Sequence, residues 1–270
     1  MVTHGAGSPD ASAAPFASVT HPIGKRTIDL LCCPTLAANR VPHGFSFRYR
    51  SLGGGAFGVR SDGEEDRRAL AAALGIESLA YMKQVHGNRV VDTDTDGEVG
   101  ECDGVVSVAD STGLIVHTAD CVPVLFWESR SNRVAACHAG WRGTRAGVAE
   151  RTARRLLDHV GSSGEGLHAV LGPSIRQCCF EVGDEVPQAF LDAGYDVDRL
   201  VERRGGRAHV DLLLANRLQL NAAGVPEAQI YDSSRCTRCE NERFYSYRAE
   251  GAGVGRVMSV IASRPGGSPE

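Results

Sequence analysis

The chain has 270 residues and a formal net charge of −4, with 29 Lys and Arg residues interspersed among 33 Asp and Glu residues. This balance gives no electrostatic basis for binding nucleic acid or an anionic membrane surface, and no stretch approaches the roughly 18 consecutive apolar residues that a membrane span needs. A chain of this length can bury a full hydrophobic core.

The composition divides the chain into three parts. Residues 1–18 are small and polar and lack the basic region and apolar core of a signal peptide, so they predict a disordered tail. Residues 19–264 predict one domain because no linker rich in Pro and Ser interrupts them, and residues 265–270 predict a flexible C-terminus. Without an export signal, we expect a cytoplasmic protein whose nine cysteines are thiols and ligands rather than disulfides.

Strands and helices alternate irregularly in the first part of the chain. Residues 41–58 predict a strand followed by a Gly-rich loop, and residues 64–74 are rich in helix formers and predict a helix. Residues 81–91 predict two short strands around a turn at His86. The acidic and polar residues 92–101 predict a surface loop.

The middle of the chain contains the most apolar segments. Strand-like patterns cover residues 103–108, 113–118 and 134–137, and the apolar residues 122–127 fit either a buried strand or the start of a helix. The last of these strands ends in a Gly-rich turn, after which apolar residues recur at helical spacing. Thr144 is therefore a candidate N-cap for a helix that ends near residue 159.

The rest of the chain mixes the two patterns as well. Strands are expected at residues 167–171, 228–231 and 256–261, and helices at 184–191 and 211–223. The long loop after residue 171 has a thiol pair, Cys178 and Cys179, and the carboxylate of Glu181, whose roles the sequence leaves open. The single Cys236-Thr-Arg-Cys239 motif has no matching second pair, which favours a plain turn over a zinc knuckle. The order of elements predicts an α/β or α+β domain with a mixed sheet.

Three potential metal ligands stand at the ends of predicted core strands. They are His86, Cys121 and His138, and strands of one sheet would bring them together. Two imidazoles and one thiolate form a three-ligand zinc site with an open fourth position, as in catalytic zinc sites. The same set suits blue copper. A multicopper oxidase, however, needs paired histidines for several copper ions, and none of the nine histidines forms an H-x-H pair, so zinc is favoured. Such a site has a net charge of about +1 and favours an anion such as phosphate.

Further polar residues are candidates for substrate contacts. Arg142 lies in a turn before a predicted helix, where an anion is readily held, and would add positive charge. His43 and Arg48 could also serve a site, although the residues alone favour a structural histidine and a solvated arginine. Asp120 is a candidate acid/base, and it could equally orient a ligand.

Five ordered motifs resemble those of the laccase-domain family. They are Lys83-Gln-Val-His86-Gly, Thr118-Ala-Asp-Cys121-Val-Pro-Val-Leu, Cys137-His138-Ala-Gly-Trp-Arg142-Gly, Gly172-Pro-Ser-Ile-Arg-Gln-Cys-Cys179-Phe-Glu-Val-Gly183 and Phe244-Tyr-Ser-Tyr-Arg248. This family is also called multicopper polyphenol oxidoreductase, and its members are described as purine nucleoside phosphorylases. The last motif adds Arg248 as a candidate for binding substrate or phosphate.

The resemblance implies a fold, a metal and a set of substrates. The fold would have two packed mixed sheets flanked by helices, similar to the catalytic domain of cytotoxic necrotizing factor. Zinc would be held by His86, Cys121 and His138. The substrates would be phosphate and adenosine, inosine, guanosine or methylthioadenosine, with deamination of adenosine in addition. Residues 51–58 depart from the family because they replace a longer Gly-Gly-Val-Ser loop and a Ser-Leu-Asn-Leu-Gly element.

Three other functions remain open at this point. Family members have been linked to editing peptidoglycan precursors, which would make the chain an amidase with Cys121 as the nucleophile. A copper-dependent polyphenol oxidase would fit the older family label. The third alternative is a scaffold without turnover that zinc stabilises. The sequence leaves the oligomeric state open.

Overall fold

The computed structural model describes residues 15–23, 26–48, 63–109 and 112–264. Most of the predicted tail, the Gly-rich loop at residues 51–58 and the C-terminus at residues 265–270 lie outside the described residues. The tail prediction extended too far by two residues, because β1 (Ala17–Ile23) begins within it and pairs along its length with β2 (Arg26–Cys32). That residues 19–264 form one domain stays a prediction.

The first of two large sheets has seven strands in the order β1-β2-β3-β16-β8-β4-β6. The other members are β3 (His43–Ser46), β16 (Val257–Ile261), β8 (Thr112–Thr118), β4 (Ser78–Lys83) and β6 (Gly97–Glu101). β4 pairs in parallel with β8 and β6, and the other pairs are antiparallel. The prediction of a surface loop at residues 92–101 is wrong, since β6 pairs with the edge of this sheet despite its polar sequence.

The second large sheet has six strands in the order β15-β11-β9-β10-β7-β5. These are β15 (Ile230–Asp232), β11 (Leu167–Leu171), β9 (Val122–Glu128), β10 (Arg133–Ala139), β7 (Gly104–Ser107) and β5 (Val90–Thr93). β5 pairs in parallel with β7, as does β11 with β15, and the rest are antiparallel. All seven residues of β9 are buried, which explains its nearly continuous apolar sequence.

A small third sheet and eight α-helices complete the described part of the chain. The sheet has the order β12-β14-β13, with β12 at Glu181–Val182, β14 at Arg207–Val210 and β13 at Val201–Arg204. The α-helices are α1 (Pro34–Ala38), α2 (Glu64–Leu74), α3 (Trp141–Arg145), α4 (Val148–Val160), α5 (Glu185–Asp192), α6 (Val197–Leu200), α7 (Leu212–Ala222) and α8 (Tyr247–Glu250). A 3-10 helix, η1, covers Glu227–Gln229.

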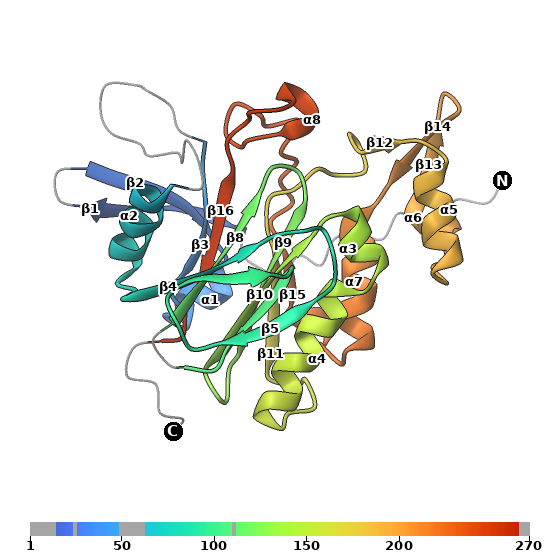
Figure 1. Cartoon of the computed structure of the whole chain (residues 1–270). Coiled ribbons are helices and arrows are strands. Elements are labelled where there is room, and N and C mark those ends of the chain that lie inside the picture. The colour runs from blue at the N-terminus through green and yellow to red at the C-terminus, as the bar shows by residue number, and fades with distance from the viewer. Residues whose placement is uncertain (1–14, 24–25, 49–62, 110–111, 265–270) are drawn as a thin grey trace.

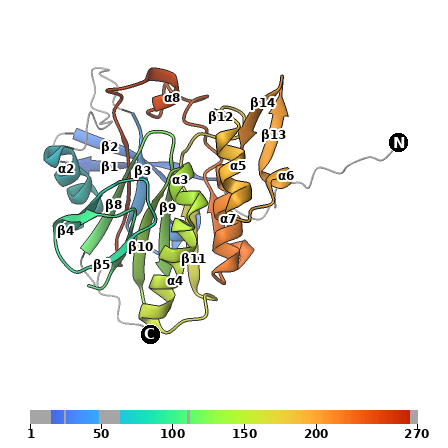
Figure 2. The same ribbon diagram turned by 45° about the vertical axis from the view of Figure 1, so that its right-hand side comes forward.

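The two large sheets pack against each other, and helices cover their outer faces. Phe45 from the first sheet and Trp127 from the second lie in one buried cluster between the sheets. Leu70 of α2 packs with the outer face of the first sheet. On the outer face of the second sheet, α4 and α7 lie side by side (Figures 1 and 2). The expected two mixed sheets with flanking helices are confirmed, and the likeness to cytotoxic necrotizing factor stays a prediction.

The expected helix after β10 is broken into α3 and α4. Gly147 between them has a φ of 80°, a left-handed conformation that ends the first helix and precedes the second. Thr144 lies inside α3, where its hydroxyl donates to the Ala139 carbonyl, so its assignment as an N-cap is wrong. Asp211, by contrast, does cap a helix, because its side chain accepts from the Leu214 backbone N–H at the start of α7.

Within the described residues, no helix has both the length and the apolar character that crossing a membrane requires. The structure has all nine cysteines as free thiols.

Candidate metal centre and its cavity

The structure brings the three predicted metal ligands together. The ligand atoms of His86, Cys121 and His138 all lie within 4.8 Å of one another. Cys121 directly precedes β9, and His138 of β10 pairs with the second residue of β9, Pro123, so strand pairing sets these two side by side. His86 comes from the turn after β4, which belongs to the first sheet, so the expectation that strands of one sheet bring all three ligands together is wrong. The ring of His86 meets that of His138 edge to face, with centroids 4.7 Å apart.

One buried carboxylate orients both histidines. Asp103 is fully buried, and its Oδ1 accepts from Nδ1 of His138 at 2.8 Å and from the backbone N–H of His86 at 3.0 Å. Its Oδ2 accepts from the backbone N–H of Gly87 at 2.6 Å. These bonds fix the turn that bears His86, whose φ of 62° is unusual for a residue with a side chain. With Nδ1 of His138 bound to Asp103, Nε2 is the ring nitrogen left to serve as a ligand.

Asp103 was not among the residues expected from the sequence. The available signal was its position directly before the buried strand β7, which matches that of Cys121 before β9.

The residues present fit a zinc ion. Two imidazoles and a thiol are a donor set that Zn²⁺ favours, and such a trio leaves one position of a tetrahedron open. Gly140 leaves the space around them clear, because a Cβ at that position would lie 3.0 Å from Sγ of Cys121 and 3.1 Å from Cδ2 of His86.

The charges of the cluster support a thiolate even without a metal. Burial alone would raise the pKa of Cys121, but the positive charge of His138 and hydrogen bonds from His138 and His86 lower it to about 6. For His138, burial opposes protonation, yet the charges of Cys121 and Asp103 raise its pKa to about 9. The two groups therefore form a thiolate–imidazolium pair near neutral pH.

The thiolate–imidazolium pair leads to a testable prediction about the reactivity of the Cys121 thiol. In chelator-treated protein, we expect the rate of Cys121 alkylation by iodoacetamide to rise with pH through about 6 and then to level off while His138 remains charged. Peptide mass spectrometry across a pH series would measure this rate. Cys137, which is fully buried and whose pKa burial raises, should stay unmodified. A midpoint near the ordinary thiol pKa of about 8.5 would contradict the pairing.

The three candidate ligands line a cavity of about 300 Å³. This volume lies at the lower end of the range of about 300–1,000 Å³ typical of small-molecule sites. The other lining residues are His117, Thr118, Ala119, Asp120, Ile175, Phe180, Tyr247, Arg248 and Arg256.

Asp120 ties the cavity wall together. Its Oδ1 accepts from the hydroxyl of Thr237 at 2.6 Å, and its Oδ2 accepts from the backbone N–H of Arg248 at 2.6 Å. Its φ of 92° lies in the left-handed region. Because both oxygens are engaged, the geometry favours a positioning role for Asp120 over that of a free acid or base.

Two arginines bring positive charge to the cavity. The Arg248 guanidinium donates to the Glu181 carbonyl at 2.7 Å and lies 5.5 Å from the centre of the Phe180 ring. Arg256, which the sequence analysis did not single out, also lines the cavity, and it donates to the Val254 carbonyl at 2.6 Å.

The other predicted substrate residues lie outside the cavity lining. Arg142 is exposed, with its guanidinium stacked over Trp141 at 4.3 Å. Arg48 forms a two-pronged ion pair with Glu250 at 2.6 and 2.8 Å. His43 is buried with both ring nitrogens engaged, Nδ1 with the Val41 carbonyl at 2.9 Å and Nε2 with the backbone N–H of Cys33 at 2.8 Å.

Burial lowers the pKa of His43 to about 4, so it stays neutral at physiological pH and has no free nitrogen for a substrate. Its environment matches the structural alternative considered from the sequence.

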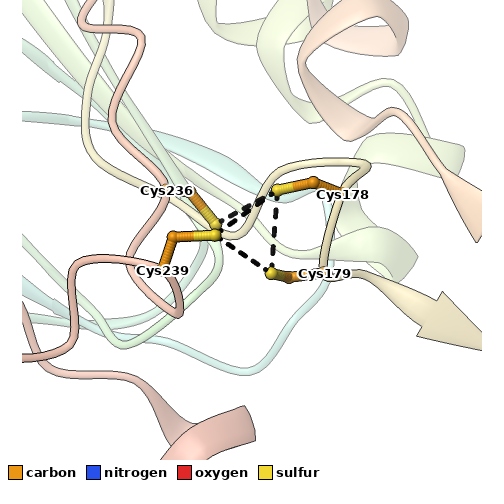
Figure 3. A group of neighbouring side chains, drawn as sticks. All are labelled: Cys178, Cys179, Cys236 and Cys239. Atoms are coloured by element: carbon orange, nitrogen blue, oxygen red, sulfur yellow. Dashed lines mark hydrogen bonds between the residues drawn. The ribbon is translucent and has the colours of Figure 1, made fainter.

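A second group of cysteines lies close to the cavity wall. Cys178, Cys179, Cys236 and Cys239 place their sulfur atoms within 4.8 Å of one another and could hold a metal ion (Figure 3). The Cys236-Thr-Arg-Cys239 motif therefore does have a second pair, and the prediction of an isolated motif is wrong. The adjacent Cys178 and Cys179 were the available signal, but adjacent cysteines do not have the spacing by which zinc motifs are recognised.

Comparison with known proteins gives consistent matches. The family described as multi-copper polyphenol oxidoreductase laccase matches residues 47–264. Adenosine deaminase RL5, from an unknown prokaryotic organism, is 40% identical over 209 residues, which cover 72% of this chain and 79% of the relative. The purine nucleoside phosphorylase of Deinococcus radiodurans is 36% identical over 245 residues, covering 87% of this chain and 92% of the relative. The crystal structure of YlmD from Geobacillus stearothermophilus superimposes with a TM-score of 0.76 at 27% identity, covering 92% of this chain and all of that one.

Proposed function

Because the chain belongs to the multi-copper polyphenol oxidoreductase laccase family, we propose that it is a zinc-dependent purine nucleoside phosphorylase that also deaminates adenosine. The observation that carries the proposal is the convergence of His86, Cys121 and His138 on one cavity. The names of two relatives support the two activities. The proposed substrates are phosphate and adenosine, inosine, guanosine or methylthioadenosine.

Zinc in this site would act as a Lewis acid, holding an anion and lowering the pKa of a bound water. The chain's own contribution is to fix the three ligands. Asp103 holds the His86 turn and the His138 ring in place, which determines which nitrogen of His138 faces the cavity.

We assign phosphate binding to the two arginines that line the cavity, Arg248 and Arg256, because Arg48 and Arg142 do not line it. Phe180 and Tyr247 present aromatic rings on which a purine base would stack. Asp120 would position this wall through Thr237 and the Arg248 backbone.

A specific observation favours a second candidate, the amidase. His138 lies between Cys121 and Asp103. In a Cys-His-Asp triad, Cys121 would be the nucleophile, His138 its base and Asp103 the carboxylate that orients the base. This arrangement would act without metal, whereas a zinc-bound thiolate is occupied. No comparable observation favours a scaffold without turnover. A copper-dependent oxidase is disfavoured because the chain lacks the H-x-H pairs of a multicopper site.

The test is metal analysis of the purified protein together with adenosine turnover, with and without phosphate. We expect zinc in the protein, adenine and ribose phosphate only when phosphate is present, and inosine in its absence. Zinc without nucleoside turnover would contradict the proposal, and amidase activity in chelator-treated protein would favour the second candidate. Unfolding on chelation, again without turnover, would favour the scaffold.

A further inference from the structure

We propose that Cys178, Cys179, Cys236 and Cys239 form a second metal site, in which four thiolates hold a structural Zn²⁺ beside the cavity. The pairs come from two loops that are far apart in the sequence, one between β11 and β12 and the other between β15 and α8. Figure 3 shows the four sulfur atoms pointing toward one another from these loops. The inference does not depend on the reaction proposed above.

The sulfur separations match a tetrahedron around one ion. Sγ of Cys178 lies 3.6 Å from Cys179, 3.7 Å from Cys236 and 3.7 Å from Cys239, and the Cys179–Cys239 separation is 3.4 Å. With Zn–S bonds of about 2.3 Å, the edges of a tetrahedral site are about 3.8 Å. A single ion therefore fits, whereas an iron–sulfur cluster would hold its thiolates farther apart around several metal atoms.

Two disulfides explain the geometry less well. Each would bring one pair of sulfur atoms to about 2.05 Å and separate it from the other pair. Instead, four of the six sulfur separations lie between 3.4 and 3.7 Å, and Cys178 is about equally far from all three partners. Four thiolates also leave no open position, which is the coordination of structural rather than catalytic zinc.

Three arginines lie beside the cluster, where their positive charge would offset the net charge of about −2 of a tetrathiolate zinc site. The Arg238 guanidinium lies 3.7 Å from Sγ of Cys179. Arg248 donates to the Cys179 carbonyl at 3.4 Å, and Arg204 donates to the Cys178 carbonyl at 3.5 Å.

The site would join the two loops that form one wall of the cavity. Thr237, between the two cysteines of the second pair, donates its hydroxyl to Asp120 and its backbone N–H to the Ser174 carbonyl at 3.0 Å. Phe180, which follows the first pair, lines the cavity itself. The metal would thus stabilise the wall that Asp120 holds together, without contacting His86, Cys121 or His138, the first centre.

Metal counting on variants tests the proposal. Wild type should contain about two zinc ions per chain, Cys121→Ala and Cys239→Ser about one each, and the double variant none. Cys32→Ala, which removes a buried thiol of β2, should keep both. Cys239→Ser should also raise the KM for nucleoside, because the wall is loosened, while the zinc at the first centre remains.

Cobalt gives a readout that needs neither activity nor a folded Cys239→Ser variant. Cys121→Ala removes the single thiolate of the first centre, so thiolate-to-cobalt charge-transfer absorption in that variant would come from the four-cysteine site. We expect this absorption, together with protection of the four thiols from a disulfide reagent until a chelator is added. A folded Cys121→Ala protein that binds no cobalt or zinc would overturn the proposal. Disulfides among the four cysteines in freshly prepared protein would also overturn it, and so would one iron ion in place of the zinc.

Discussion

Replacing Cys121 by alanine is expected to abolish nucleoside turnover, with a loss on the order of 10³-fold or more in kcat/KM. The substitution removes the one thiolate of the first centre and leaves two imidazoles, His86 and His138, which are a poor site for zinc. It also removes the negative charge that raises the pKa of His138. Steady-state kinetics with adenosine and phosphate, beside zinc analysis of the same preparation, would measure both effects.

The fold should survive this change. Cys121 lies in a turn that lines the cavity, so its loss creates no enclosed void in the core. We expect the Tm of chelator-treated Cys121→Ala to stay close to that of chelator-treated wild type. The matched control is Cys32→Ala, which removes a thiol from β2, outside the cavity lining, and should leave turnover unchanged. Turnover by Cys121→Ala within tenfold of wild type would show that the first centre does not perform the chemistry.

The site of His86, Cys121 and His138 was predictable because these residues lie at the ends of core strands. Cys121 directly precedes β9 and His138 is the next-to-last residue of β10. The apolar sequences of β9 and β10 mark them as core strands, and their antiparallel pairing brings these two ends together. The burial of β9 was also predictable, because its nearly continuous apolar sequence is typical of a strand that is buried on both faces. In the structure, one face of β9 packs against the first sheet and the other against the helices.

Features set by tertiary contacts were not predictable from local pattern. β6 has the polar sequence Gly-Glu-Val-Gly-Glu and is a strand only because β4 offers an edge to pair with. Arg48 and Arg142 looked as suitable for phosphate as Arg248 did, because sequence does not show which guanidinium faces the cavity. The four-cysteine cluster requires two distant loops to meet, which no spacing rule anticipates.

Replacing Asp103 by asparagine is the second change with a large expected effect. It removes the buried charge that pairs with His138 and puts an amide N–H₂ group where one of two accepting oxygens stands. Breaking one partner of such a buried pair costs about 3–5 kcal/mol in the free energy of unfolding. Loss of the group that orients a metal-binding histidine lowers zinc affinity by about 10–100-fold. Urea unfolding and competition with a zinc chelator would measure the two quantities.

Because Asp103 acts through His86 and His138 rather than on the substrate, its loss should be recoverable. Excess zinc should restore much of the turnover of Asp103→Asn, while it should restore none in Cys121→Ala, where a ligand itself is missing. Asp92→Asn is the matched control, since Asp92 pairs with Arg155 at 2.6 Å on the surface, and we expect a change within about 0.5 kcal/mol. Unchanged zinc affinity in Asp103→Asn would mean that the backbone of the His86 turn and the packing around His138 suffice to hold the ligands, and that the carboxylate serves stability alone.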